Sequence, residues 1–334
     1  MKRGRRVVSV VGATGLVGSE ITRTLFLRKF PLERINLFSS GRSPETEAAL
    51  PGGRVPIRRF SPAGVRGSDI IFLAAGGGFS RKYARPLAAM GGVVIDNSSA
   101  FRMDPDVPLV VPEVNPRDAF EHAGLIANPN CSTIQMVLVL APLHRRYRLR
   151  RVVVSTYQSV SGAGLKAVGE LAAHSDAALC GKTLEPREFP HEIAFNIIPQ
   201  IDRFDESGWT FEETKMIKET RKILGDDSIS IVPTVARVPV FRGHSESVFA
   251  EFAEPVDLRQ TRELLEQAGG VRVMDDPRRA LYPTPIHCAG RDETFVGRIR
   301  LDPDSPHGLV IWIVSDNLRK GAALNAVQIA ELFV

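Results

Sequence analysis

The chain has 334 residues, of which 43% are hydrophobic and 24% charged, a composition typical of a soluble globular protein long enough for two domains. Its net charge of +5 comes from scattered arginines, and no basic run is interleaved with aromatic residues, which argues against nucleic-acid binding. The three cysteines, Cys131, Cys180 and Cys288, are far apart and lack metal-ligand spacing, so we expect neither disulfides nor a metal site. No stretch approaches the ~20 apolar residues of a membrane span, and the basic N-terminus lacks a signal-peptide pattern, which predicts a cytoplasmic protein with no membrane partner.

The N-terminal segment has the pattern of a nucleotide-binding βα unit. Residues 7–11 read as a buried parallel strand, residues 12–18 carry glycines at every third position, and a helix pattern continues to about residue 28. Glycines between a strand and a helix let the backbone approach a pyrophosphate at the helix N-terminus. A tight structural turn would also explain the pattern, so this signal is weak on its own.

The next predicted strand, residues 35–38, bears on the choice of cofactor. An NAD site places an acidic residue near this point to bind the ribose 2′-hydroxyl. This chain instead has Ser40, Arg42 and Ser43, whose hydroxyl and guanidinium groups suit a 2′-phosphate. We therefore predict NADP(H), although an ordinary polar loop with an incidental arginine stays open.

Strands at residues 69–74 and 93–96, separated by a helix at 80–90, predict βαβ units in an open parallel sheet. The loop at residues 97–102 follows a strand, and ligands bind at the carboxyl ends of strands in such sheets. Arg102 in this loop is a candidate clamp for phosphate or carboxylate. The alternative is an ordinary exposed arginine.

Residues 128–133, Asn-Pro-Asn-Cys-Ser-Thr, lie before a long apolar run. Pro129 disfavours helix at the residue before it, and Asn130 has the side chain of a helix N-cap. Cys131 would then be the first residue of a helix, where free backbone N–H groups lower a thiol's pKa and favour the thiolate. A small buried core cysteine is the competing interpretation.

The second half of the chain has the pattern of an α+β domain with a mixed or antiparallel sheet. A candidate catalytic base, His244, lies in a predicted glycine-containing loop between two strands, whereas the other six histidines have less suitable surroundings. The predicted strands are residues 152–158, 228–238, 247–253, 294–301 and 309–315, and the predicted helices are 165–179, 210–224, 258–268 and 318–333.

Seven segments in order give the chain a resemblance to the aspartate-semialdehyde dehydrogenase family over essentially its whole length. They are residues 12–18, 95–102, 128–133, 157–164, 212–215, 237–244 and 315–323. The resemblance implies reduction of L-aspartyl 4-phosphate by NADPH to L-aspartate 4-semialdehyde and phosphate, a step toward lysine, diaminopimelate, methionine and threonine. The implied intermediate is a thioester on a cysteine.

The resemblance also implies a role for each site residue. Cys131 would be the nucleophile, His244 the acid/base with a pKa near neutrality, and Gln158 an orienting group. The substrate-binding residues would be Arg102, Asn130, Glu212, Lys215 and Arg237. Which of Glu212 and Glu213 points inward stays open, although the spacing to Lys215 favours Glu212; a solvent-exposed helix salt bridge is the alternative for that pair.

The implied cofactor site includes Gly12, Ala13, Thr14, Gly15, Leu16, Val17, Ser40, Arg42, Ser43, Ser161, Gly162 and Asn317. The implied fold class is α/β: a Rossmann-like parallel-sheet nucleotide-binding domain, residues 1–127 with 316–334, and an α+β catalytic and dimerisation domain, residues 128–315. We expect a homodimer, with a tetramer as the alternative.

Two rival functions stay open at this stage. N-acetyl-γ-glutamyl-phosphate reductase shares the fold and the thioester chemistry, but its cysteine lies in a Gly-Cys-Tyr-Pro context unlike residues 130–133 here. A non-catalytic homologue with a binding role would lack the cysteine, whereas this chain keeps Cys131, Gln158 and His244 together.

Overall fold

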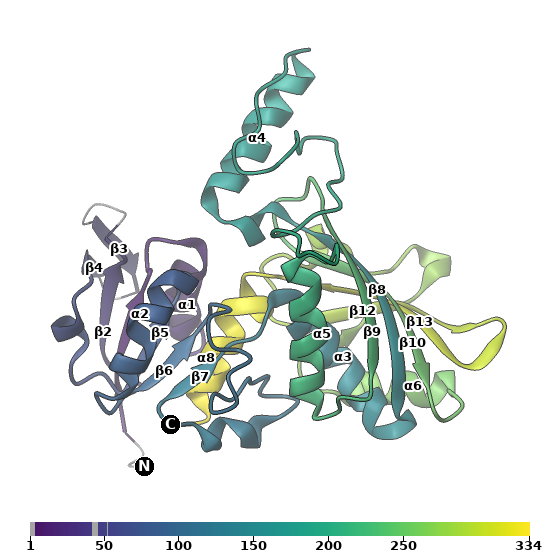
Figure 1. The fold of residues 1–334 in the computed structure, drawn as a ribbon, viewed down its shortest axis with the longest axis horizontal. Helices are drawn as coiled ribbons and strands as arrows, with labels where there is room; N and C mark the ends of the chain where they lie inside the picture. The colour runs from purple at the N-terminus through teal and green to yellow at the C-terminus, as the bar shows by residue number, and fades with distance from the viewer. Residues whose placement is uncertain (1–3, 42–45, 52) are drawn as a thin grey trace. The chain divides into compact units, whose positions relative to one another are not determined.

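The computed structural model describes residues 4–41, 46–51 and 53–334. These residues form two compact units, Met1–Pro129 with Ala322–Val334 and Asn130–Gly321. The expected domain boundaries lie close to these limits. Figure 1 shows the C-terminal helix among the elements of the first unit.

The first unit is a seven-stranded sheet in which every neighbouring pair is parallel except one (Figure 1). Strands buried on both faces are the reason why the sequence shows continuous apolar runs here. Helices α1 (Leu16–Leu27) and α8 (Leu324–Glu331) pack together and contribute to its apolar core. The strand order is β3 (Thr46–Leu50), β4 (Gly53–Arg59), β2 (Leu32–Ser39), β1 (Arg6–Val11), β5 (Ile70–Leu73), β6 (Val93–Asp96) and β7 (Leu125–Ala127), with α2 at Gly77–Ala88.

The antiparallel pair β3 and β4 has no counterpart among the predicted elements. Most side chains of both strands are exposed, and only Ile57 is buried. A hairpin at the edge of a sheet carries little apolar alternation, and that alternation is the main signal for a strand.

The second unit is built on a six-stranded mixed sheet, in agreement with the predicted α+β class (Figure 1). The order is β11 (Val271–Val273), β12 (Thr294–Asp302), β13 (Ser305–Ser315), β10 (His244–Phe252), β8 (Leu149–Gln158) and β9 (Ser230–Arg237). The helices are α3 (Cys131–Tyr147), α4 (Leu165–Leu179), α5 (Phe211–Leu224), α6 (Leu258–Gln267) and α7 (Pro285–Cys288). Helix α3 packs against β10, whose side chains alternate between a buried face and a half-buried one.

Two local expectations were wrong. His244 is the first residue of strand β10 and does not lie in a loop. The predicted helix 318–333 is divided into a π-helical turn, Arg319–Ala323, and the α-helix α8.

The described residues contain neither a membrane-spanning helix nor a cluster of metal-binding side chains. None of their helices combines the length and the apolar character that crossing a bilayer requires. They also contain no group of three or more histidine, cysteine or acidic side chains that could hold a metal ion.

Candidate active site

Three predicted site residues lie at one edge of the second sheet because of strand register. Gln158 ends β8 and Arg237 ends β9, and the two residues are partners in the parallel pairing of these strands. His244 begins β10, which runs antiparallel to β8 and pairs Ser245 with Tyr157. An amide, a guanidinium and an imidazole therefore lie at the same end of three neighbouring strands.

Helix α3 begins as predicted. The Asn130 side chain caps it, with Oδ1 accepting hydrogen bonds from the backbone N–H groups of Ser132 (3.0 Å) and Thr133 (3.2 Å). Cys131 is the first residue of the helix, is partly exposed and is a free thiol. The fully buried core cysteine of the competing interpretation is therefore excluded.

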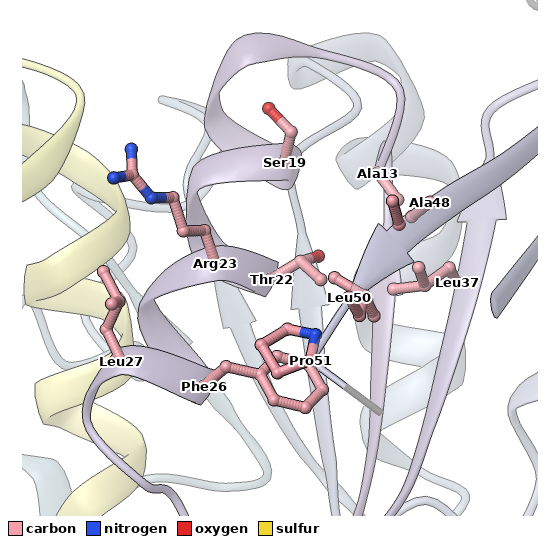
Figure 2. A pocket seen from close by; sticks show the side chains of 11 residues that line it. Ala13, Ser19, Thr22, Arg23, Phe26, Leu27, Leu37, Ala48, Leu50 and Pro51 are labelled. Carbon is pink, nitrogen blue, oxygen red and sulfur yellow. The ribbon is translucent and has the colours of Figure 1, made fainter. Parts of the chain in front are cut away.

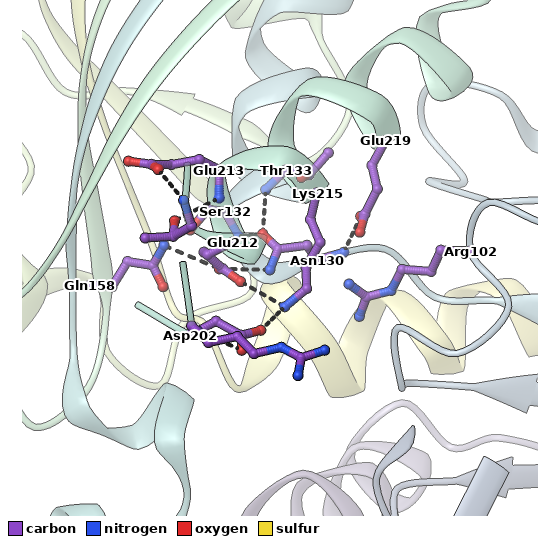
Figure 3. Close-up of polar contacts among 12 residues, drawn as sticks. Arg102, Asn130, Ser132, Thr133, Gln158, Asp202, Glu212, Glu213, Lys215 and Glu219 are labelled. Carbon is purple, nitrogen blue, oxygen red and sulfur yellow. Dashed lines mark hydrogen bonds and ion pairs between the residues drawn. The ribbon is translucent and has the colours of Figure 1, made fainter. Parts of the chain in front are cut away.

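Glu212 is a buried carboxylate shared by three site residues (Figure 3). Its Oε1 accepts hydrogen bonds from Asn130 Nδ2 at 2.8 Å and from Gln158 Nε2 at 3.3 Å. Its Oε2 accepts from Lys215 Nζ at 3.2 Å. A single acidic group therefore orients the helix cap, the amide at the sheet edge and a lysine.

Glu213 has a different role. It forms a capping box at the start of α5, in which its Oε2 accepts from the Thr210 backbone N–H at 2.7 Å and the Thr210 side chain accepts from the Glu213 N–H. Its Oε1 accepts from Val235 N at 3.2 Å. Because both oxygens of Glu213 are used in this way, Glu212 is the carboxylate that faces the site.

Two further acidic residues of this network, Asp202 and Glu219, were not among the predicted site residues. Asp202 lies 2.8 Å from Lys215 Nζ, and its ion pair with Lys215 helps to hold the pKa of the Asp202 carboxyl below its usual range, against the opposing effect of burial. Buried Glu219 accepts a 2.6 Å hydrogen bond from the Asn130 backbone N–H. Glu219 is two turns along α5 from Glu212, so helical periodicity could have indicated it.

Arg237 is buried at the end of β9, the outermost strand on this side of the second sheet. Its Nη1 donates to the Ser159 carbonyl at 2.6 Å, and its Nε has no hydrogen-bond partner among the described residues. Burial lowers the pKa of the guanidinium, and the charges of Glu212 and Cys131 oppose that effect. The guanidinium therefore lies within electrostatic reach of the thiol, with one N–H available to a ligand.

His244 is fully buried, and its contacts define its tautomer. Nδ1 accepts the Ser159 backbone N–H at 3.0 Å, and because an amide can only donate, the neutral ring must carry its proton on Nε2. Nε2 has no partner among the described residues. Burial, followed by the charge of Arg237, lowers the pKa of His244 well below 6.5, so the expected pKa near neutrality was wrong.

Asn317 joins the segment after β8, which carries the predicted cofactor residues Ser161 and Gly162, to the loop before β10. Its Oδ1 accepts from Ser161 Oγ at 3.2 Å and from the Gly243 N–H at 2.9 Å, and its Nδ2 donates to Ser161 Oγ. Gly162 lies so close to the catalytic groups that a Cβ there would be 3.0 Å from Arg237 Nη1 and 3.3 Å from His244 Nε2. The absence of a side chain at residue 162 therefore leaves the space that these two groups occupy.

The glycine-rich turn of the first unit fits a dinucleotide pyrophosphate. Gly12 has φ +92°, and a Cβ there would lie 2.4 Å from the Ala74 carbonyl oxygen. At Gly18 a Cβ would be 2.2 Å from the Gly12 carbonyl oxygen, so helix and strand pack closer than any side chain allows. Gly15 is the N-cap of α1 and provides no capping side chain, which leaves the N–H groups of the first turn to a ligand.

The other predicted residues of this turn, Ala13, Thr14, Leu16 and Val17, surround the same helix N-terminus, and Ser40 directly follows β2. Arg42 and Ser43 lie outside the described residues.

A pocket of about 450 Å³ lies between α1, β2 and β3 (Figure 2). Phe26, Leu50 and Pro51 are directed toward one another across it, whereas the Arg23 guanidinium points away. The Thr22 hydroxyl donates to the Gly18 carbonyl. These lining groups do not match phosphate, so the glycine turn is the better place for the cofactor's phosphates.

Arg102 is buried in the first unit. Its Nε donates to the Asn128 carbonyl at 2.9 Å and its Nη2 to the Asn97 carbonyl at 3.2 Å. It thus joins the loops that follow β6 and β7, at the carboxyl edge of the sheet. The exposed arginine of the alternative interpretation is excluded.

Comparison with known proteins identifies both units. Residues 7–122 match the family described as semialdehyde dehydrogenase, NAD binding domain, and residues 140–320 match semialdehyde dehydrogenase, dimerisation domain. Together the two matches cover most of the chain.

Individual relatives agree with these family matches. An aspartate-semialdehyde dehydrogenase from Aquifex aeolicus (strain VF5) is 50% identical over 98% of this chain and 97% of its own length. The Bacillus subtilis (strain 168) enzyme of the same name is 48% identical over 99% and 98%. A crystal structure of aspartate semialdehyde dehydrogenase II from Vibrio cholerae complexed with ASA has a TM-score of 0.94 at 44% identity, covering 98% of both chains. The predicted family is confirmed, the reductase rival is not favoured, and this chain belongs to the aspartate-semialdehyde dehydrogenase family.

Proposed function

We propose that this enzyme reduces L-aspartyl 4-phosphate to L-aspartate 4-semialdehyde and phosphate, with Cys131 as the nucleophile. The observation that best supports this proposal is the position of Cys131 at the N-terminus of α3, within electrostatic reach of Arg237. The cytoplasm, with its reducing conditions, is the expected location.

The thiolate of Cys131 attacks C4 of the acyl phosphate. The bond from C4 to the phosphate oxygen breaks, the leaving phosphate takes up one proton from solvent and departs as HPO₄²⁻, and a thioester remains. Bound NADPH supplies the hydride that reduces the thioester carbon. Collapse of the resulting tetrahedral oxyanion breaks the C–S bond, which releases the aldehyde and regenerates the thiolate.

The one proton that the reaction consumes goes to the leaving phosphate, so hydride transfer and cleavage of the C–S bond need no proton from His244. A neutral imidazole with its proton on Nε2 can donate a hydrogen bond to the oxyanion, and a preorganised donor of this kind stabilises the transition state. The lowered pKa of His244 keeps the ring in this form at neutral pH. We therefore assign His244 as the oxyanion donor and Gln158 as an orienting group.

The family resemblance suggests which residue binds each charged group of the substrate, and the charges of these residues agree with it. The Arg237 guanidinium suits the α-carboxylate, and Glu212, with its hydrogen bond to Asn130, suits the ammonium group. Lys215 and Arg102 suit the phosphate, since both are cationic.

NADP(H) is the proposed cofactor. Gly12, Gly15 and the first turn of α1 would hold the pyrophosphate, with Ala13, Thr14, Leu16 and Val17 around it. Ser40, Arg42 and Ser43 would hold the 2′-phosphate, and Ser161, Gly162 and Asn317 would lie by the nicotinamide portion. Arg42→Ala should weaken NADPH binding more than NADH binding, and equal losses would count against the 2′-phosphate role.

The second unit also supports a homodimer. Strand residues on the face opposite α3 are only half-buried in the single chain, including Tyr157, Phe249, Val310 and Trp312. An apolar sheet face of this kind is typical of subunit interfaces. Light scattering coupled to gel filtration would distinguish dimer, tetramer and monomer.

The function is tested by phosphate-dependent oxidation of L-aspartate 4-semialdehyde with NADP⁺, the reverse reaction. We expect NADPH to form only when phosphate or arsenate is present. The matched control is N-acetyl-L-glutamate 5-semialdehyde. A preference for that control substrate would refute the assignment.

A further inference from the structure

Arg59 lies at the edge of the first sheet where the nucleotide is proposed to bind. It is the last residue of β4, which runs parallel to β2 and pairs Arg59 with Ser39. The backbone continues this pairing, because Phe60 N donates to the Ser39 carbonyl at 3.0 Å. Both residues are therefore at carboxyl ends of neighbouring strands, the edge that binds ligands in such sheets.

The Arg59 side chain reaches the loop that follows β2. Its Nε lies 3.5 Å, and its Nη2 3.9 Å, from the position that a Cβ on Gly41 would take. Gly41 has φ +91°, a conformation that favours glycine and turns the chain directly after Ser40. The guanidinium therefore lies against Gly41, directly after Ser40, which is one of the proposed 2′-phosphate contacts.

Ser39, the strand partner of Arg59, carries a polar group at the same place. The Ser39 hydroxyl is fully buried, and its Oγ makes no hydrogen bond with any described residue. Partners in a β-ladder project from the same face of the sheet, so Ser39 and Arg59 are on one face. Arg58, the preceding residue, projects from the other face and is also exposed.

We propose that Arg59 is a specificity-determining residue that binds the 2′-phosphate of NADP(H). This assignment rests on the proposed use of NADP(H). A guanidinium matches the geometry of a phosphate dianion with paired, charge-assisted hydrogen bonds. NAD(H) has a neutral hydroxyl at the same ribose position, so Arg59 raises the affinity for NADP(H) selectively.

Binding of two small nucleotides by isothermal titration calorimetry tests the assignment without turnover. Adenosine 2′,5′-bisphosphate carries the 2′-phosphate, and adenosine 5′-monophosphate does not. We expect Arg59→Ala to raise the Kd of the bisphosphate about tenfold or more and that of the monophosphate less than about twofold. The control Arg58→Ala removes the same charge one residue away and should change either Kd by less than about threefold at physiological salt.

The outcomes separate this inference from the proposed cofactor. If the wild-type protein prefers the bisphosphate and Arg59→Ala retains that preference, the role of Arg59 is refuted and NADP(H) stands. If Arg59→Ala and Arg58→Ala weaken binding of the bisphosphate equally, the loss comes from the overall positive charge of this surface. The assignment is then again refuted. A wild-type protein that binds both nucleotides equally would overturn the NADP(H) proposal together with the role of Arg59.

Discussion

In the second unit, hydrogen bonds between side chains fix the positions of the predicted site residues. In the first unit, backbone hydrogen bonds fix the glycine turn. Glu212 accepts hydrogen bonds from Asn130 and Gln158. By contrast, the N–H groups of Gly12 and Ala13 both donate to the Phe38 carbonyl. The proposed catalytic residues therefore depend on hydrogen bonds between side chains, whereas the glycine turn depends on the absence of side chains.

The largest expected effect is the loss of turnover when Cys131, the proposed nucleophile of the second unit, is replaced. Cys131→Ala removes the nucleophile, so turnover should fall at least about 10⁴-fold, because no other group can form the thioester. NADPH binding, measured by fluorescence titration, should stay within about twofold of the wild-type value because the glycine turn is untouched. Substantial remaining turnover would exclude the thioester mechanism.

The hydrogen-bond role of His244 predicts a graded series. His244→Ala removes the donor and should lower kcat about 10²- to 10³-fold. His244→Gln places an amide N–H near the position of Nε2 and should recover at least about tenfold of that loss. An obligatory proton carrier would lose as much activity in the glutamine variant as in the alanine variant, and that result would reject the oxyanion-donor role.

Two glycine substitutions contrast the units directly. Gly162→Ala places a methyl group against the side chains of Arg237 and His244, so kcat/KM should fall about 10²-fold while the melting temperature hardly changes. Gly12→Ala places a methyl group against the Ala74 backbone, which cannot shift without disturbing the sheet, at a residue with positive φ. The free energy of unfolding should therefore fall by more than about 2 kcal/mol. Thermal unfolding measures the stability of each variant, and steady-state kinetics measures its kcat/KM. A large loss of stability in Gly162→Ala would contradict the expected difference between the two variants.

Local patterns in the sequence predicted those parts of the site that depend on one segment. The Asn130 cap and the first-turn position of Cys131 follow from neighbours in the chain. The choice between Glu212 and Glu213 depends only partly on local pattern. The capping box with Thr210 uses one oxygen of Glu213 and is local, but the other oxygen accepts from Val235 of strand β9.

Tertiary placement likewise explains what the sequence patterns missed. The contact of Asp202 with Lys215 and the lowered pKa of His244 both arise from groups brought together by the fold. The parallel sheet and most helices were predictable because apolar periodicity is local, whereas the exposed hairpin β3–β4 lacked that periodicity.

The smallest predicted effect concerns two fully buried polar side chains, Glu246 and Gln135. Glu246 is two residues after His244 on the buried face of β10, and Gln135 is one helical turn after Cys131 on α3. Both side chains are fully buried, without a hydrogen bond of normal geometry to any described residue. Burial raises the pKa of the Glu246 carboxyl well above 4.5.

Glu246→Gln tests whether the Glu246 carboxyl has a raised pKa in the folded protein. Because the folded pKa of Glu246 is raised, its contribution to stability is complete below about pH 4.5 and is lost as pH rises toward the folded pKa. The glutamine variant has nearly the same shape but no proton to lose, so its melting temperature relative to wild type should increase as pH rises from 4.5 to 8. His244 is present in both proteins, and its own titration cancels in the difference. A difference in melting temperature that is constant over this range would mean that Glu246 is ionised in the folded protein as it is in the unfolded chain.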